Sequence, residues 1–263
     1  MKFTSENALN QWVSAAEYLW LFLDYDGTLV NFSPTPDIIE PDKKVISLLR
    51  HLADKQRLRV AIVSGRRLLD LQKLLPISGI YIAGTYGIEI LTPEGERIQR
   101  VDFASIRPYL ERLKPHWEEI INGQKGFFLE DKGWSMAVHA RYASEQDARR
   151  VISNIQHTLD QDLITDEYRL IKYKKFLEVS PAIANKGKAV SFLLNKFPMP
   201  GARLVYIGDD DNDSEAFETV HSLGGVAIAV AQYFGYVRSS GGDYVLKSPK
   251  AVRRWLGNLL KWF

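Results

Sequence analysis

The feature that most constrains this sequence is an apolar run that ends abruptly in two carboxylates. Tyr18–Leu23 is wholly apolar or aromatic, and Asp24, Tyr25 and the Asp26-Gly27 pair follow it at once. The run is too short for a buried helix and suits a central parallel strand that is covered on both faces. Asp-Gly favours a turn. The sequence therefore predicts a buried parallel strand with two carboxylates at its carboxyl end.

Two further predicted strands also end in polar residues. Leu58–Val63 stops at Ser64-Gly65-Arg66, and Arg203–Ile207 is followed by Gly208 and an acidic run. In an open parallel sheet the carboxyl ends of the strands face one crevice, so these side chains should converge. The expected cluster contains Asp24, Asp26, Ser64, Asp209, Asp210, Asp211 and Asp213.

The pattern around these strands predicts two domains. Helical periodicity in Pro41–Leu52 and from Leu68 onward, a strand at Ile80–Ala83 and a hairpin at Gly87–Ile98 alternate in the manner of an α/β fold. The middle of the chain changes character, and the first pattern resumes after Asn185 and ends in a C-terminal helix. We expect an α/β, Rossmann-like parallel-sheet core of residues 1–105 and 180–263, with an α+β domain of antiparallel type, 106–179, inserted in it.

Composition excludes several classes of function. The chain has 263 residues and no cysteine, so a disulfide framework, a thiolate zinc site and a thiol nucleophile are impossible. Its formal net charge of +2 gives no global excess for nucleic acid. We find no signal peptide before Trp20, and no apolar stretch approaches the roughly 18 residues that cross a bilayer. We expect a cytoplasmic protein, a monomer or weak oligomer, that binds neither nucleic acid nor a membrane.

Four short motifs resemble those of the haloacid dehalogenase superfamily of phosphohydrolases. They are the Asp-x-Asp-Gly-Thr run Asp24–Thr28, the strand-end Ser64, Lys186, and the Gly-Asp-x-x-Asn-Asp run Gly208–Asp213. The inserted segment stands where the type-2 caps of that superfamily stand. This resemblance implies a magnesium-dependent phosphatase with a capped α/β core.

Physical chemistry gives each motif residue an expected role. Clustered carboxylates repel one another, so Asp24, Asp26 and Asp209 call for a hard divalent cation, for which we expect Mg²⁺. Asp24 would attack phosphorus and form an aspartyl-phosphate, and Asp26 would act as general acid and base. In families similar to this one the backbone carbonyl at the position of Asp26 also reaches the metal.

The remaining motif residues would hold the phosphoryl group and the metal. Ser64 can donate a hydrogen bond to a phosphoryl oxygen, and the ammonium of Lys186 can neutralise phosphate and nucleophile together. Asp213 would complete the metal site by orienting a metal-bound water, or would hold Lys186. For Asp210 the sequence leaves two roles open: support of this site, or capping of the loop.

Within the superfamily the chain looks most like the trehalose-6-phosphate phosphatases. Glu130-Asp-Lys…His139-Ala-Arg141 is similar to their Glu-x-Lys…His-x-Arg cap motif, and Glu178-Val-Ser-Pro…Asn185-Lys-Gly187 to their Glu-x-x-Pro…Asn-Lys-Gly segment. The resemblance implies hydrolysis of trehalose 6-phosphate, a small sugar phosphate, to trehalose and phosphate. The expected substrate-binding residues are Arg66, Glu130, Lys132, His139, Arg141 and Glu178.

Two departures keep other readings open. Tyr86 stands where that family usually has His, and Asn212 stands where Thr is usual. Phosphatases of glucosyl- or mannosyl-phosphoglycerate, glucosylglycerol phosphate or hexose phosphates therefore remain possible. A phosphomutase would share the aspartyl-phosphate step, and a non-catalytic sugar-phosphate sensor of the same fold would have no need of an intact nucleophile.

Overall fold

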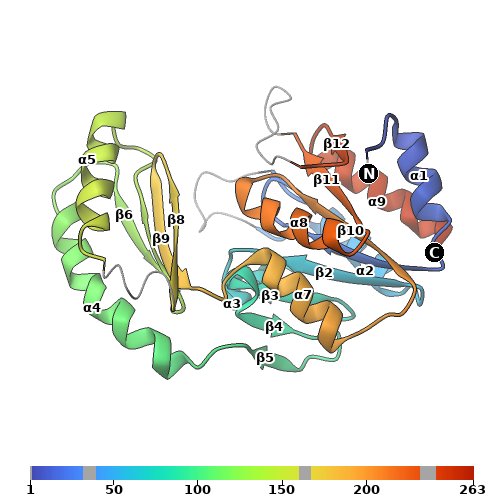
Figure 1. Ribbon diagram of the computed structural model, residues 1–263, viewed down its shortest axis with the longest axis horizontal. Helices are drawn as coiled ribbons and strands as arrows, with labels where there is room; N and C mark the ends of the chain where they lie inside the picture. Colours follow the sequence, from blue (N-terminus) through green and yellow to red (C-terminus); the bar gives the residue numbers. More distant parts are fainter. Residues whose placement is uncertain (1, 32–39, 160–166, 232–240) are drawn as a thin grey trace. The chain divides into compact units, whose positions relative to one another are not determined.

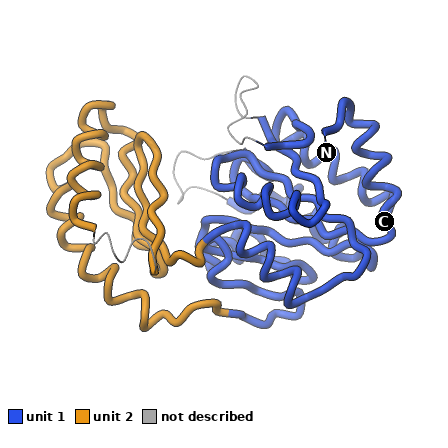
Figure 2. Tube along the Cα trace, viewed as in Figure 1, with its two compact units in different colours: residues 1–98, 185–263 blue, residues 99–184 orange. Residues whose placement is uncertain are grey.

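The computed structural model describes residues 2–31, 40–159, 167–231 and 241–263 (Figure 1). The chain forms two compact units, one of residues 1–98 with 185–263 and one of residues 99–184 (Figure 2). The second unit is wider at both ends than the insert expected from the sequence, 106–179. It is wider because it takes in the whole of helix α4, Phe103–Ile121, and of strand β9, Phe176–Pro181.

The first unit is built on an eight-stranded sheet of order β12-β11-β10-β1-β2-β3-β4-β5. Strand β1 lies between β10 and β2 and pairs parallel with both, so that Leu23 stands level with Ile207 and Ile62. Strand β4 pairs antiparallel with β3. The strands are β1 Tyr18–Leu23, β2 Leu58–Val63, β3 Tyr81–Gly84, β4 Glu89–Leu91, β5 Arg97–Gln99, β10 Ala202–Gly208, β11 Val226–Val230 and β12 Tyr244–Leu246.

Helices cover both faces of this sheet, which explains why β1 is apolar throughout. Leu19, Leu21 and Leu23 share a core with helices α1, α2, α3 and α9. Trp20 and Phe22 point the other way and pack with α7 and α8. The helices are α1 Glu6–Ser14, α2 Lys43–Ala53, α3 Leu68–Leu74, α7 Lys186–Lys196, α8 Ser214–Ser222 and α9 Pro249–Trp262.

The second unit is a four-stranded sheet of order β6-β7-β9-β8 with helices on one face (Figure 1). Its neighbouring strands all pair antiparallel. Met136, Val138, Leu177 and Val179 form a core with α4 and α5. The other elements are β6 Phe128–Asp131, β7 Met136–His139, α5 Glu145–Gln156 and β8 Tyr168–Tyr173. The predicted fold class, an α/β core with an inserted α+β unit, is confirmed.

The structure departs from the sequence analysis in two elements of the core. Helix α1 was not predicted; it is capped by the Ser5 hydroxyl and buries only Leu9 and Val13, which is too little apolar signal to detect. Helix α7 begins at Lys186, two residues before Lys188, where the sequence pattern predicts a helix Lys188–Phe197, because the side chain of Asn185 caps it. Across the described residues, the helices are too short or too polar to span a lipid bilayer.

A carboxylate holds α4 to the inserted sheet, and its loss should destabilise that unit. Both oxygens of Asp131 accept from the Arg107 guanidinium at 2.7 and 2.8 Å, and Lys114 adds a bond at 3.1 Å. We expect Asp131→Asn to lower the free energy of unfolding by about 2 kcal/mol, because the guanidinium loses its charged partner.

Urea unfolding at neutral pH measures this loss. The matched control is Glu145→Gln, which removes an exposed pair with Arg149 in the same unit and should change the free energy by less than about 0.5 kcal/mol. An equal effect of the two substitutions would contradict a stabilising role for Asp131.

Candidate active site

The predicted motif residues meet at one edge of the large sheet. Asp24 follows β1, Ser64 follows β2 and Asp209 follows β10, and these three strands are parallel neighbours. From β1 the chain builds β2 and β3 to one side, while β10 and β11 lie to the other, so the strand order reverses here. Ligands of open α/β sheets bind at such reversals.

Lys186 stands between two of the converging carboxylates. Its Nζ lies 2.9 Å from Oδ1 of Asp24 and 2.7 Å from Oδ1 of Asp213, and its side chain is only 3% exposed. Burial disfavours the ammonium form, but Asp213 and Asp24 outweigh burial and raise the pKa of Lys186 well above its usual value. The lysine is therefore a fixed positive charge beside Asp24.

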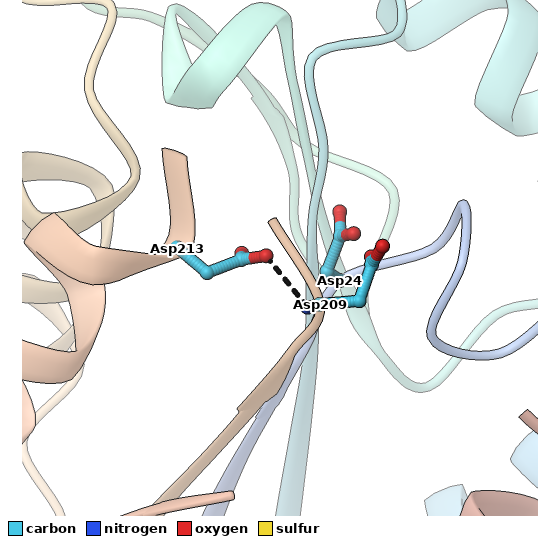
Figure 3. A group of neighbouring side chains, drawn as sticks. All are labelled: Asp24, Asp209 and Asp213. Carbon is cyan, nitrogen blue, oxygen red and sulfur yellow. Dashed lines mark hydrogen bonds between the residues drawn. The ribbon is translucent and has the colours of Figure 1, made fainter. Parts of the chain in front are cut away.

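Both carboxylate oxygens of Asp213 accept hydrogen bonds. Oδ1 accepts from Lys186 and from the Tyr206 hydroxyl, each at 2.7 Å. Oδ2 accepts from the backbone N–H groups of Asp209, at 2.9 Å, and Asp210, at 3.0 Å; Figure 3 draws the first of these. Of the two roles expected for Asp213, holding Lys186 is the one that this geometry favours.

Tyr206 is a member of the site that the sequence analysis missed. It lies on β10, fully buried, and its hydroxyl bonds Asp213. A tyrosine inside an apolar strand needs a partner for its hydroxyl, so the strand Arg203–Ile207 carried a usable signal. Nothing in the sequence says which acceptor that partner is.

A glycine in the loop after Asp24 leaves room for the carboxylate of Asp209. Gly27 has φ 79°, and a β-carbon there would lie 2.3 Å from Oδ2 of Asp209. Thr28 donates its hydroxyl to Oδ1 of Asp209 at 3.2 Å. Oxygens of Asp24, Asp209 and Asp213 lie within 4.8 Å of one another, and Figure 3 shows the carboxylates of Asp24 and Asp209 side by side.

The electrostatics of this group leave a shortage of positive charge. Burial is the main cause that raises the pKa of Asp24 well above its usual value; Lys186 opposes it, and Asp213, Asp209 and Asp210 add to it. Among the described residues that shift the pKa of Asp24, one ammonium therefore accompanies three further carboxylates. A hard divalent cation held by oxygen ligands would offset the excess, so the donor set of Asp24 and Asp209 fits such an ion.

The carboxylate of Asp26 is not part of this candidate metal-binding group and is paired with Arg66 instead. Its Oδ2 accepts from Nε of Arg66 at 2.6 Å and its Oδ1 from Nη2 at 2.8 Å. Ser64 is buried, and its hydroxyl oxygen accepts from the N–H of Arg66 at 3.2 Å. A carboxylate in such a fork must give up one bond before it can exchange a proton with a substrate.

Apart from Arg66, the residues expected to bind the substrate lie on the second unit. Strand alternation places Glu130, His139 and Glu178 on the face of the small sheet opposite α4 and α5. Glu130 Oε2 lies 2.8 Å from Nε2 of His139. Arg141 is exposed in the turn that follows β7.

Glu178 and Lys132 form a buried pair on this face. Lys132 Nζ donates to Oε2 of the fully buried Glu178 at 3.0 Å, and the hydroxyl of Ser135 donates to its Oε1 at 2.6 Å. Ser135 was not predicted. The pairing holds the Lys132 ammonium in place while its side chain keeps 9% of its surface exposed.

Comparison with known proteins places these observations in a family. The protein-family model described as Trehalose-phosphatase matches residues 22–250. A probable trehalose-phosphate phosphatase of Sinorhizobium fredii is 34% identical over 212 residues, which cover 80% of this chain and 77% of that protein. Two mycobacterial trehalose-phosphate phosphatases, at 30% identity, are covered over 60% of their length, so the chain spans only part of those longer relatives.

Solved structures share the fold at lower identity. The C-terminal domain of the C. albicans trehalose-6-phosphate phosphatase superposes with a TM-score of 0.83 at 19% identity, covering 99% of this chain and 98% of that one. A haloacid dehalogenase-like hydrolase from Bacteroides thetaiotaomicron gives 0.63 at 18% identity, covering 92% and 99%. The resemblance inferred from the motifs is confirmed.

Proposed function

This chain belongs to the trehalose-phosphatase family, and on that premise we propose that it hydrolyses trehalose 6-phosphate to trehalose and inorganic phosphate. The observation that supports the chemistry best is the placement of the Lys186 ammonium 2.9 Å from Oδ1 of Asp24, whose carboxylate in turn lies close to that of Asp209. A buried nucleophile next to a fixed cation is what attack on an anionic phosphate requires.

The transfer takes two steps at Asp24. A carboxylate oxygen of Asp24 attacks phosphorus, the bond from phosphorus to the sugar oxygen breaks, and Asp26 gives that oxygen its proton. Water then attacks the phosphorus of the aspartyl-phosphate, Asp26 takes the proton of the water, and phosphate leaves with the Asp24 carboxylate restored. Lys186 and the Ser64 hydroxyl hold phosphoryl oxygens during both steps.

Mg²⁺ is the cation that we propose for this site. Asp24 and Asp209 would hold it, with the backbone carbonyl of Asp26 as a further ligand, while Asp213 holds Lys186. When bound, the ion screens the approach of Asp24 to the anionic phosphate and stabilises charge on the equatorial oxygens.

We assign recognition of the sugar to the second unit. Glu130, His139 and Lys132 offer acceptors and donors on one sheet face, as a polyhydroxyl ligand requires. Glu178, buried and bonded to Ser135 and Lys132, supports this surface by fixing the ammonium of Lys132. Arg66 is bonded to Asp26, so its part is to place that carboxylate.

A panel of phosphate esters tests the substrate. We expect kcat/KM for trehalose 6-phosphate to exceed that for glucose 6-phosphate, glucosyl-phosphoglycerate and mannosyl-phosphoglycerate by about 100-fold or more, because those esters cannot make the same set of sugar contacts. Release of inorganic phosphate measures each rate. Preference for another ester would overturn the substrate, and a strict requirement for a sugar bisphosphate would identify a mutase.

Glu130→Ala separates recognition from chemistry. We expect kcat/KM for trehalose 6-phosphate to fall about 10- to 100-fold, or about 1.4–2.8 kcal/mol, because one or two charge-assisted hydrogen bonds are lost. Hydrolysis of a small aryl phosphate should hardly change, because that ester does not need the sugar-binding face. Steady-state rates on the two esters measure the split.

The matched control for Glu130→Ala is Glu118→Ala, an exposed glutamate on α4 of the same unit. It should leave both rates unchanged. Equal losses on the two esters in Glu130→Ala would place Glu130 in a structural role.

A further inference from the structure

A turn that carries no predicted catalytic group lies between two segments that do. This segment, residues 84–87, is called here the Tyr86 turn; it begins at the last residue of β3, at the edge of the sheet that carries the site. The N–H of Tyr86 donates to the carbonyl of Ser64 at 2.8 Å, and its carbonyl accepts from the N–H of Asn185 at 3.1 Å. Asn185 caps the helix that begins at Lys186. One residue therefore bonds both phosphate-binding segments.

The Tyr86 turn is held in an uncommon backbone conformation. Thr85 has φ 48° and Tyr86 has φ 54°, and within the described ranges they are the only non-glycine residues with positive φ. Such a conformation costs about 1–3 kcal/mol for each residue, so it persists only where neighbours fix it. The bonds of Tyr86 and a third bond, from the N–H of Thr85 to the carbonyl of Arg66 at 2.6 Å, fix it here.

The ring of Tyr86 also fills the space over the turn that bears Ser64. Tyr86 is 7% exposed, and a β-carbon on Gly65 would lie 2.7 Å from its Cζ and 2.8 Å from its hydroxyl oxygen. Gly65 is not among the glycines with positive φ, so its backbone would accept alanine. The Tyr86 ring is the obstacle to a side chain at residue 65.

We propose that Tyr86 is a positioning residue for the phosphoryl site. Its ring against Gly65 and its two backbone bonds set the Ser64 hydroxyl relative to the Lys186 ammonium. These are the groups that the proposed function assigns to the phosphoryl oxygens, so this inference rests on that function. Tyr86 itself needs no contact with the substrate.

A double-mutant cycle tests the ring contact. The variants are Gly65→Ala, Tyr86→Ala and the two combined; the readouts are kcat/KM on a small aryl phosphate, the inhibition constant of inorganic phosphate, and Tm. We expect Gly65→Ala to lower kcat/KM about 100-fold and Tyr86→Ala about 10-fold, with weaker inhibition by phosphate, since misplacement by about 1 Å is that costly. The combined variant should return to the level of Tyr86→Ala, because alanine then meets no ring.

Two comparisons make the cycle decisive. Tyr86→Phe keeps the ring and should stay within about threefold of wild type, whereas a loss as large as that of Tyr86→Ala would remove the ring as the cause. The positioning role would be overturned if the losses in kcat/KM of the two single variants multiplied in the combined variant. It would also be overturned if Tm fell while the inhibition constant of inorganic phosphate stayed unchanged. If the wild type ignores trehalose 6-phosphate, the substrate proposal fails, while the aryl phosphate and inorganic phosphate still test this one.

Discussion

Asp24→Asn is expected to lower kcat on every phosphate ester by at least about 10³-fold, with the chain still folded. An amide of the same shape cannot attack phosphorus, so no aspartyl-phosphate forms. The carbonyl oxygen of this amide can still accept a hydrogen bond from Lys186, whose Nζ lies 2.9 Å from Oδ1 of Asp24 in the native chain. Release of inorganic phosphate under single-turnover conditions measures the loss.

The same substitution should leave Tm unchanged or raise it when metal is absent. Burial and three neighbouring carboxylates work against the charge of Asp24, and a neutral amide relieves that cost, as catalytic sites often trade stability for reactivity. Asp54→Asn, at an exposed carboxylate that follows α2, is the matched control and should keep full activity. More than a few per cent of wild-type activity in Asp24→Asn would remove Asp24 as the nucleophile.

Removal of divalent metal should abolish turnover, and Mg²⁺ should restore it. The carboxylates of Asp24 and Asp209 stand close together, and Lys186 pairs with Asp24, so without a metal the phosphate would meet excess negative charge. Ca²⁺ should substitute poorly, because its larger and looser coordination shell misplaces the nucleophile. Phosphate release in chelator, and then with each metal added back, measures the effect.

A binding readout separates loss of metal from loss of fold. Mg²⁺ should raise Tm of the wild type by mass action and do so much less for Asp209→Asn, which lacks one of the proposed ligands. Glu89→Gln, on β4 of the same unit and outside the cluster, should respond like the wild type. Full activity in excess chelator would end the proposal of a metal.

The strands and the convergence of the site could be predicted because both depend on local pattern. The bounds of β1 and β2 coincide with the predicted strands Tyr18–Leu23, which is apolar throughout, and Leu58–Val63, which is apolar except for Arg59, since burial on both faces favours apolar residues until the strand ends. The rule for strand ends then places Asp24 and Asp209 together, although they are far apart in the sequence. No partner has to be known for either inference.

The partners inside the site could not be predicted, because they depend on where side chains from separate elements end. Two examples are the hydrogen bonds from Tyr206 to Asp213 and from Ser135 to Glu178. The local sequence around one member of each pair gives no information about the other. The fork of Arg66 on Asp26 is of the same kind. A positive φ at Tyr86 runs against residue preference, so local pattern argues for the wrong conformation there.

The place of β1 between β2 and β10 has a consequence for synthesis on the ribosome. Its partner on one side is made within a few dozen residues, but its partner on the other side follows only after the whole of residues 99–184. At about 5–20 residues per second, the nascent apolar strand waits roughly 10–40 seconds with one edge unpaired. The inserted unit is continuous in sequence and can fold during that interval, whereas Asp24 first meets Asp209 at its end. Chaperone dependence of this chain should therefore arise from the exposed edge of β1, before any phosphate-binding site exists.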